Sequence, residues 1–228
     1  MTFALIHGSG QNAAGWERLA ALLTARGHDV AAPDLPKHEP AWGIEAYADE
    51  IGRALPQDAI LVGHSFSGTL LPVVATRHRC AMLVFLAAVI PEPGKSVRDQ
   101  FAADPRMFSR DWIAAGPRWF DPTERDRLAR EFLFHDCDEP TATWALTTLE
   151  VFDTRQLVVQ PAPFSRWPSG PAASIVAGGD RTLTADWGRR AGRRAGVETI
   201  EVPGGHCPHV SRPGEIADIL ERLAAVAP

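Results

Sequence analysis

Short apolar segments alternate with longer amphipathic stretches over most of this chain. The stretch 12–26, for example, places Trp16, Leu19 and Leu23 at the spacing of one helix face, and Gly27 follows it as a helix stop. The apolar segments are too short for helices and read as buried strands. They lie at 2–6, 28–32, 59–63, 80–87, 172–177 and 197–202. This alternation predicts an α/β fold, with a mostly parallel sheet of about six strands covered by helices on both faces.

The alternation stops in the middle of the chain. Proline pairs border this middle segment, and helix-like stretches rich in aromatic residues and arginine replace the strands. We therefore expect one domain over residues 1–228, with a core formed by 1–90 and 166–228 and a helical cap inserted at 91–165.

Composition and charge restrict the classes of partner. With 228 residues, of which 45% are hydrophobic and 22% charged, the chain can bury one sizeable core. The formal net charge is -5 and the basic residues are scattered, so we expect neither a nucleic-acid partner nor binding to membranes. The first ten residues lack the basic start and the long apolar run of a secretion signal, which favours a cytoplasmic location.

The sequence offers no pattern typical of a metal or cofactor site. Cys80, Cys137 and Cys207 lack metal-ligand spacing, and their odd number disfavours a disulfide framework, so we expect reduced thiols. The histidines also lack ligand spacing. The glycine-rich segment 6–10 has neither the G-x-G-x-x-G pattern nor a Walker lysine, which disfavours a nucleotide site. We therefore expect no metal and no cofactor.

One strand runs directly into a turn that carries a serine. The segment reads LVGHSFSG over residues 61–68, and a further apolar, helix-like stretch follows it. A serine between a buried strand and a helix, with small residues two positions before and after it, is typical of a nucleophile elbow. Gly63 and Ser67 meet the size limit, although the usual pattern has glycine at the position of Ser67. We therefore predict that Ser65 is a nucleophile.

A serine hydroxyl needs a general base, and the base needs a third group that holds it in the right tautomer. After the strand at 172–177 comes Asp180, and after the strand at 197–202 a Gly-Gly pair precedes His206. This order along the chain, serine then acid then histidine, favours His206 as base and Asp180 as its partner. Asp153 remains an alternative acid, and His209 remains an alternative base.

Attack on an acyl group creates an oxyanion, which two backbone N–H groups have to bind. One donor should be the N–H of Phe66, directly after the nucleophile. The other should come from the loop after the first strand, with Ser9 as first choice and Gly10 as second. Small residues in this loop let the backbone approach a substrate.

Four further residues are candidates for substrate binding. Gly8 lies in the loop after the first strand, and His64 precedes the nucleophile. His64 should also form hydrogen bonds that support the loops beneath the site. Trp112 and Trp144 are aromatic residues of the cap, which has more of them than a surface segment needs. We expect the cap aromatics to favour an apolar substrate.

These residues together resemble a known family. The matching segments are LIHGSG at 5–10, PDLP at 33–36, VGHSFSG at 62–68, AGGDRTLTADW at 177–187 and PGGHCPHVSRPGEIADIL at 203–220. In this order they resemble the α/β-hydrolase superfamily, in particular the compact branch of plant-type methylesterases, hydroxynitrile lyases and uncharacterised bacterial hydrolases. The resemblance implies an α/β-hydrolase fold and cofactor-independent cleavage of a small or medium ester.

The resemblance also leaves two alternatives open. Lyases of this branch resemble one another in having a threonine in the loop after the first strand and a lysine after the catalytic histidine, where this chain has Gly8 and Cys207. A carboxylesterase is therefore favoured over a hydroxynitrile lyase. A small-molecule-binding protein that keeps this fold is the other alternative. Dehalogenases and epoxide hydrolases need a carboxylate at the position of Ser65, so the nucleophile disfavours them.

Overall fold

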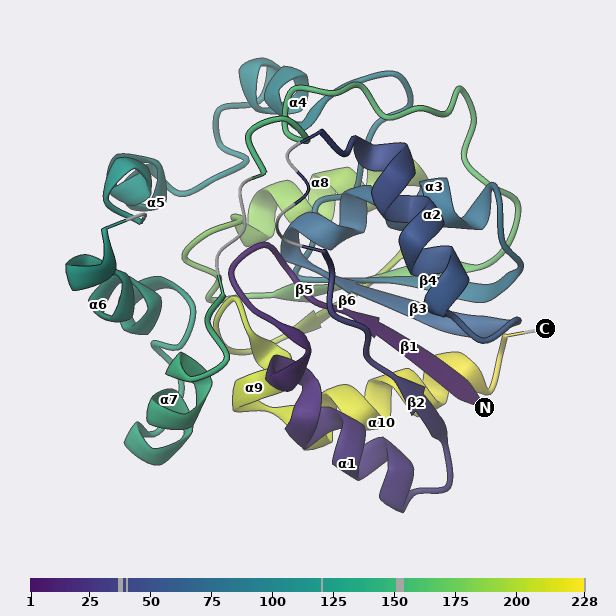
Figure 1. Ribbon diagram of the computed structural model, residues 1–228, viewed down its shortest axis with the longest axis horizontal. Coiled ribbons are helices and arrows are strands. Elements are labelled where there is room, and N and C mark those ends of the chain that lie inside the picture. Colours follow the sequence, from purple (N-terminus) through teal and green to yellow (C-terminus); the bar gives the residue numbers. More distant parts are fainter. Residues whose placement is uncertain (37–38, 40, 120, 151–153, 228) are drawn as a thin grey trace.

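Six parallel strands form one sheet in a computed structural model that describes residues 1–36, 39, 41–119, 121–150 and 154–227 (Figure 1). The strand order is β2-β1-β3-β4-β5-β6, and every pairing is parallel. The strands are β1 Thr2–Ile6, β2 Asp29–Ala31, β3 Ala59–His64, β4 Cys80–Leu86, β5 Ala172–Ala177 and β6 Glu198–Val202. The prediction of a mostly parallel sheet of about six strands is confirmed.

Helices cover both faces of this sheet, as the sequence predicts (Figure 1). On one face lie α1 Glu17–Ala25 and α10 Pro213–Ala224, whose apolar sides pack on β1, β3 and β5. On the other face lie α2 Ile44–Ala54, α3 Leu71–Ala75 and α8 Ala185–Ala195, which share a second apolar cluster with the sheet. β3 and β4 are buried over nearly their whole length, because helices cover them on both sides.

The predicted helix over 12–26 has a different start from the one the apolar spacing suggests. It begins as a 3-10 helix, η1 Ala13–Trp16, and becomes α-helical only in α1. The side chain of Asn12 accepts a hydrogen bond from the backbone N–H of Ala14, which closes the first turn tightly. Trp16 is still buried, so the apolar face is continuous through the change of helix type.

The segment 91–165, called the cap segment below, contains only helices among its described elements. They are α4 Val97–Ala103, α5 Arg110–Ala115, η3 Gly116–Arg118, α6 Pro122–Phe132 and α7 Glu139–Leu146. In Figure 1, α5, α6 and α7 lie together beyond the carboxyl ends of the strands. Their apolar side chains form a cluster with Cys207 and Val210, which follow β6. The cap segment therefore packs over the edge of the sheet where parallel strands end.

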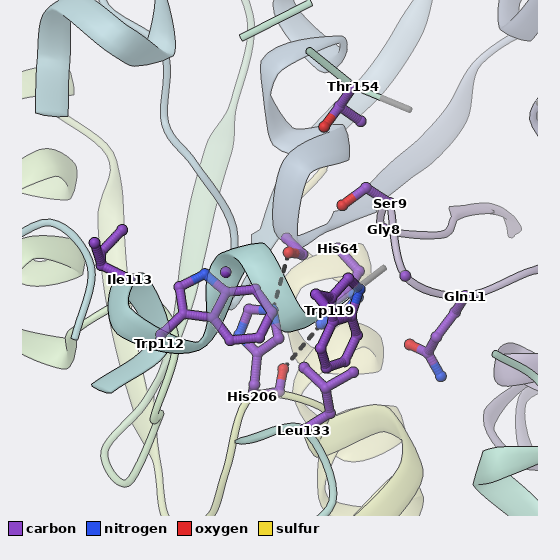
Figure 2. A pocket seen from close by; sticks show the side chains of 13 residues that line it. Gly8, Ser9, Gln11, His64, Trp112, Ile113, Trp119, Leu133, Thr154 and His206 are labelled. Carbon is purple, nitrogen blue, oxygen red and sulfur yellow. Dashed lines mark hydrogen bonds between the residues drawn. The ribbon is translucent and has the colours of Figure 1, made fainter. Parts of the chain in front are cut away.

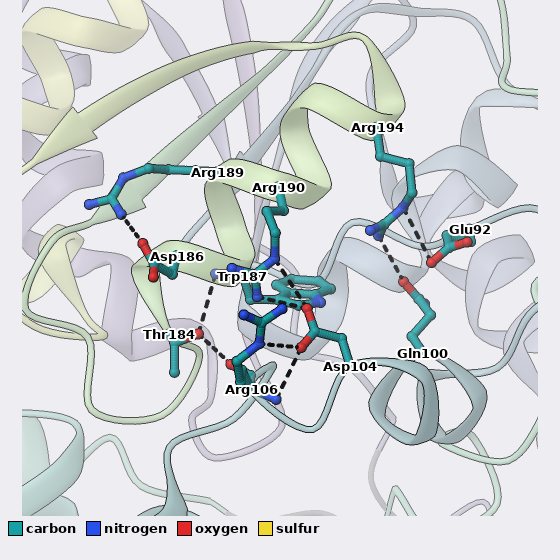
Figure 3. Close-up of polar contacts among 10 residues, drawn as sticks. All are labelled: Glu92, Gln100, Asp104, Arg106, Thr184, Asp186, Trp187, Arg189, Arg190 and Arg194. Carbon is teal, nitrogen blue, oxygen red and sulfur yellow. Dashed lines mark hydrogen bonds and ion pairs between the residues drawn. The ribbon is translucent and has the colours of Figure 1, made fainter.

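Ion pairs connect the start of the cap segment to α8 (Figure 3). Arg190 contacts Asp104 at 2.7 Å, and Asp104 also accepts a hydrogen bond from Arg106 at 3.0 Å. Arg194, one turn further along α8, contacts Glu92 at 3.2 Å. These contacts fix the cap segment on the side of the sheet that α8 covers.

The described helices include none that is both long and apolar enough to cross a bilayer.

Candidate active site

Ser65 lies on a strained turn at the carboxyl end of β3. The strand ends at His64, a 3-10 helix η2 runs from Ser65 to Thr69, and α3 follows. Ser65 has a φ of 55°, in the left-handed region that is unfavourable for residues other than glycine. A Cβ added to Gly68 would lie 2.2 Å from the carbonyl oxygen of Val89, so this turn has room only for glycine there. The predicted strand-turn-helix around the serine is therefore present.

Three side chains from three strand ends form a continuous chain of hydrogen bonds. Nε2 of His206 lies 2.9 Å from Oγ of Ser65, and Nδ1 of His206 lies 2.7 Å from Oδ2 of Asp180. The His206 side chain is 4% exposed and that of Asp180 is 3% exposed, so water is largely excluded from the second contact. The structure thus brings together the three residues that the sequence predicts as nucleophile, base and acid.

Thr182 is a member of this group that the sequence interpretation missed. Its Oγ lies 2.7 Å from Nδ1 of His206 and 2.9 Å from Oδ1 of Asp180. Its backbone N–H also donates to Oδ1 of Asp180, at 2.7 Å. An aspartate followed two residues later by threonine is a typical turn pattern, and that pattern is the signal that could have indicated the contact.

The structure describes the alternative base, His209, but not the alternative acid. Asp153 lies outside the described residues. His209 is buried, and its ring lies 4.5 Å from the ring of His64 and 4.2 Å from that of Trp16. Burial lowers the pKa of His209 to about 3, so this ring is neutral at pH 7. His209 is therefore placed as a packing residue.

His64 supports the loop that carries His206. Its Nε2 donates to the backbone carbonyl of His206 at 2.9 Å, in line with the predicted supporting role. Burial, together with the nearby His209 and His206, lowers the pKa of His64 well below its ordinary value. His64 is therefore a neutral hydrogen-bond donor beneath the nucleophile.

One group of side chains is compact enough to be considered as a metal site. The possible ligand atoms of His64, Cys207 and His209 lie within 4.8 Å of one another, and no other such group of His, Cys, Asp or Glu occurs among the described residues. Nε2 of His64, which lies 3.9 Å from Sγ of Cys207, already donates to His206. The Cys207 thiol has its pKa raised well above the ordinary value by burial. A metal would have to break the His64 contact and deprotonate the thiol, so the group fits a packed core better than a metal centre.

The loop after β1 lies beside the nucleophile. A Cβ added to Gly8 would lie 2.9 Å from Cβ of Ser65, so the backbone approaches the serine closely at this glycine. Gln11 donates through its backbone N–H to the carbonyl of Gly8, and this turn leaves Ser9 and Gly10 at its tip. The N–H of Phe66 belongs to the first turn of η2, where helical N–H groups lack a partner within the helix. Both predicted oxyanion donors thus lie in segments next to Ser65, and their role stays a prediction.

Ser65 is one of the residues that line a cavity of about 230 Å³, which Figure 2 shows from close by. One side is formed by the loop after β1 and by the residues around the nucleophile, and the other by the cap segment. The lining residues are Gly8, Ser9, Gly10, Gln11, His64, Ser65, Trp112, Ile113, Gly116, Trp119, Leu133, Thr154 and His206. The cavity is therefore mostly apolar on the cap side and polar on the side of the sheet.

Three of the four predicted substrate-binding residues border this cavity, and one does not. Gly8, His64 and Trp112 are among its lining residues. Trp144 is not, and the expectation for it is wrong: its ring packs under the guanidinium of Arg18, 4.5 Å from the ring centre. Trp119 takes the expected place instead, packed edge to face on Trp112 at 5.1 Å. The sequence alone does not distinguish Trp112 and Trp119, which line the cavity, from Trp144, which packs against α1.

Comparison with known proteins agrees with this architecture. Residues 3–219 match the alpha/beta hydrolase family. The chain is 39% identical over 103 residues to a pyrethroid hydrolase of Sphingobium wenxiniae, a match covering 40% of this chain and only 36% of that protein. It is 28% identical over 181 residues to methylesterase 1 of Arabidopsis thaliana, covering 70% and 65%. The crystal structure of polyneuridine aldehyde esterase superimposes with a TM-score of 0.80 at 20% identity, covering 98% of each chain. The predicted α/β-hydrolase fold and the resemblance to plant methylesterases are confirmed.

Proposed function

This chain belongs to the alpha/beta hydrolase family, and we propose that it is a cofactor-independent serine hydrolase that cleaves carboxylic esters. One observation carries the proposal: Ser65, His206 and Asp180 form one chain of hydrogen bonds, with contacts of 2.9 and 2.7 Å, and Ser65 and His206 line a cavity. A methylesterase of Arabidopsis thaliana is among the relatives in sequence, and polyneuridine aldehyde esterase has the same fold, which supports ester cleavage.

The proposed reaction uses groups of the chain and one water molecule. Oγ of Ser65 attacks the ester carbonyl while Nε2 of His206 takes its proton. The backbone N–H groups of Phe66 and Ser9 bind the oxyanion, and the proton on His206 then passes to the leaving alcohol. Water, activated by the same histidine, hydrolyses the acyl-enzyme and releases the acid. Asp180 accepts from Nδ1 of His206 throughout, so the ring keeps the tautomer that the reaction needs.

The lining of the cavity favours an uncharged, compact ester. Its described lining residues contain no lysine, arginine, aspartate or glutamate. Two arginines of the cap segment are engaged in ion pairs: Arg106 contacts Asp104, and Arg118 contacts Glu124. A volume of about 230 Å³ lies slightly below the usual range for small-molecule sites, which suits a small or medium substrate. The apolar wall formed by Trp112, Trp119 and Leu133 is expected to hold the apolar part of the ester.

Hydrolysis of p-nitrophenyl acetate, butyrate and octanoate by the purified protein, with a chelator present, tests the proposal. Ser65→Ala and His206→Ala should each lower kcat by at least about 10³-fold, since the members of a triad act as a unit. Ser9→Ala is the matched control, because it also removes a serine hydroxyl at the cavity but keeps the backbone N–H, and it should stay within about 3-fold of wild type. Undiminished activity in Ser65→Ala would contradict the proposal, and so would a wild type that turns over none of the three esters.

A further inference from the structure

Two oxygen atoms compete for the same nitrogen of the proposed base. Oδ2 of Asp180 and Oγ of Thr182 each lie 2.7 Å from Nδ1 of His206. A neutral imidazole with its proton on Nδ1 has one hydrogen for both oxygens, so the hydrogen bond is shared between them. We propose that Thr182 is a positioning residue, whose hydroxyl holds the ring of His206 together with Asp180. This inference rests on the proposed function, in which His206 is the base.

The direction of each hydrogen bond follows from the donors available. The hydroxyl of Thr182 has one hydrogen, and it donates to Oδ1 of Asp180 at 2.9 Å. Its lone pairs then remain free to accept from Nδ1–H of His206. The backbone N–H of Thr182 donates to the same Oδ1 at 2.7 Å. Thr182 thus holds one oxygen of the carboxylate with two donors and leaves the other oxygen, Oδ2, for the histidine.

Burial makes this arrangement difficult for water to replace. Thr182 is 3% exposed and His206 is 4% exposed. If the hydroxyl were removed, the ring would lose one acceptor, and the carboxylate would lose one of the donors that fix its orientation. A hydrogen bond to a charged group in a site without water is among the stronger ones, and the histidine becomes charged during the reaction.

The backbone of Thr182 is held by the cap segment. Its carbonyl accepts from the N–H of Ser109 at 2.8 Å, and Ser109 is the N-cap of α5. The adjacent Leu183 forms an antiparallel bridge with Phe108. α5 also carries Trp112, which lines the cavity. The cavity wall and the group that positions the histidine are therefore attached to each other through the backbone of two consecutive residues, Thr182 and Leu183.

The test compares Thr182→Val, which keeps the shape of the side chain but removes the hydroxyl, with Thr182→Ser, which restores it. Thr141→Val is the matched control. Thr141, on α7, is also a buried threonine, and its hydroxyl accepts a hydrogen bond from the charged side chain of Arg18 at 2.8 Å. Each protein is treated with diisopropyl fluorophosphate: Oγ of Ser65 bonds to phosphorus, fluoride leaves, and the hydroxyl proton passes to His206. The same proteins are assayed with p-nitrophenyl butyrate.

We expect Thr182→Val to lower both kcat and the labelling rate by about 10- to 100-fold, with KM nearly unchanged because Thr182 does not line the cavity. Thr182→Ser and Thr141→Val should stay within about 3-fold of wild type. Equal rates in wild type and Thr182→Val would overturn the inference. Loss in both the valine and the serine variant would overturn it too, since the hydroxyl would then not be the cause.

An NMR measurement separates failure of this inference from failure of the proposed function. The imidazole Nδ1–H of His206 should give a downfield proton resonance in wild type, protected from exchange because two buried oxygens accept from it. This resonance should broaden in Thr182→Val and persist in Thr182→Ser. If diisopropyl fluorophosphate does not label Ser65 in wild type, the proposed nucleophile is wrong. The Nδ1–H resonance of His206 then decides the role of Thr182 by itself, and a resonance that is unchanged in Thr182→Val rejects that role.

Discussion

The hydroxyl of Ser67 donates a hydrogen bond to the backbone carbonyl of His7, and both residues are buried. Ser67 lies two residues after the proposed nucleophile, and His7 begins the loop after β1. The contact therefore connects the two segments that supply the proposed oxyanion donors, Phe66 and Ser9. In this chain a serine stands where the usual elbow pattern has glycine, and its hydroxyl is used for that connection.

Removal of this hydroxyl by Ser67→Ala should lower kcat by about 10-fold and the free energy of unfolding by about 1 to 2 kcal/mol, because the buried carbonyl of His7 loses this donor. Ser96→Ala is a suitable control, since Ser96 is a buried N-cap of α4 that does not line the cavity. It should lower stability by about 1 kcal/mol and leave kcat unchanged. Equal kcat values for the two variants, measured together with urea unfolding, would argue against a role of Ser67 in aligning the two loops.

Two glycines of the loop after β1 should respond very differently to alanine. The added Cβ in Gly8→Ala would lie 2.9 Å from Cβ of Ser65 and 3.3 Å from the backbone oxygen of His64, and neither atom can move without shifting the nucleophile. In Gly10→Ala the nearest atoms, on Trp119 and Leu133, are 3.7 and 3.9 Å away, which is ordinary contact. We expect kcat to fall by at least about 100-fold in Gly8→Ala, since small displacements of a nucleophile are costly.

Gly10→Ala should mainly change KM, because its methyl group narrows the cavity without touching Ser65. Steady-state kinetics with p-nitrophenyl butyrate measures both effects. A Gly8→Ala enzyme with wild-type kcat would show that the close approach of the two backbones is not needed for the reaction.

The sequence predicts the sheet well because its signals are local. Each expected strand from 2–6 to 197–202 is present with its ends shifted by at most one residue. Parallel strands buried on both faces have to be apolar over their whole length, so their pattern is clear without any knowledge of neighbours. The carboxyl ends of such strands share one edge, which is why residues after β1, β3, β5 and β6 could be predicted to meet.

The cap segment is predicted less well because its packing is decided by distant partners. Trp112 and Trp144 both lie in helical stretches of the cap segment, yet one borders the cavity and the other packs under Arg18 of α1. Gln11, Trp119 and Leu133 also line the cavity without any local pattern that marks them. The contact of Thr182 with His206 depends on a turn whose shape the cap segment fixes. The catalytic roles of Ser65, His206 and Asp180 stay predictions until the variants are assayed.

The ion pairs between α8 and the cap segment should make this junction sensitive to salt (Figure 3). Asp104→Asn weakens the contacts to Arg190 and Arg106, and we expect a loss of about 1 kcal/mol in the free energy of unfolding, since these groups are partly exposed. The loss should shrink in 1 M NaCl because salt screens the pairs. Asp186→Asn is the control: Asp186 contacts only Arg189 of the same helix at 2.6 Å, among the ion pairs drawn in Figure 3.

Hydrogen exchange locates the effect. Backbone amides of α4 and of residues 104–109 should exchange faster in Asp104→Asn and not in Asp186→Asn. The Arg106 guanidinium, and to a smaller extent Arg190, hold the pKa of Asp104 below its usual range. The contribution of the Asp104 ion pairs to the free energy of unfolding is therefore present at neutral pH and is lost as the pH falls through that lowered pKa. Equal exchange rates at residues 104–109 in the two variants would show that the ion pairs do not fix the cap segment.

The buried histidines should make the protein less stable in mild acid. Burial lowers the pKa of His209 to about 3, while an unfolded histidine has a pKa near 6.5. Between these values the unfolded chain binds a proton that the folded protein does not, so stability falls with decreasing pH, by up to about 1.4 kcal/mol per pH unit for each such residue. His64, whose pKa burial also lowers, adds to the same slope. Above about pH 6.5 this contribution is constant.

His209→Phe should remove one of the two contributions. Nδ1 of His209 has no hydrogen-bond partner, and the ring packs on Trp16 and His64, so a phenyl ring can take its place at little cost. Urea unfolding at pH 7, 6 and 5 should give a free energy of unfolding that falls less steeply with decreasing pH in the variant than in wild type. Below about pH 6 the two slopes should differ by about 1.4 kcal/mol per pH unit, which corresponds to one proton. If the two slopes are equal, His209 binds a proton in the folded protein at these pH values, and its placement as a neutral packing residue is wrong.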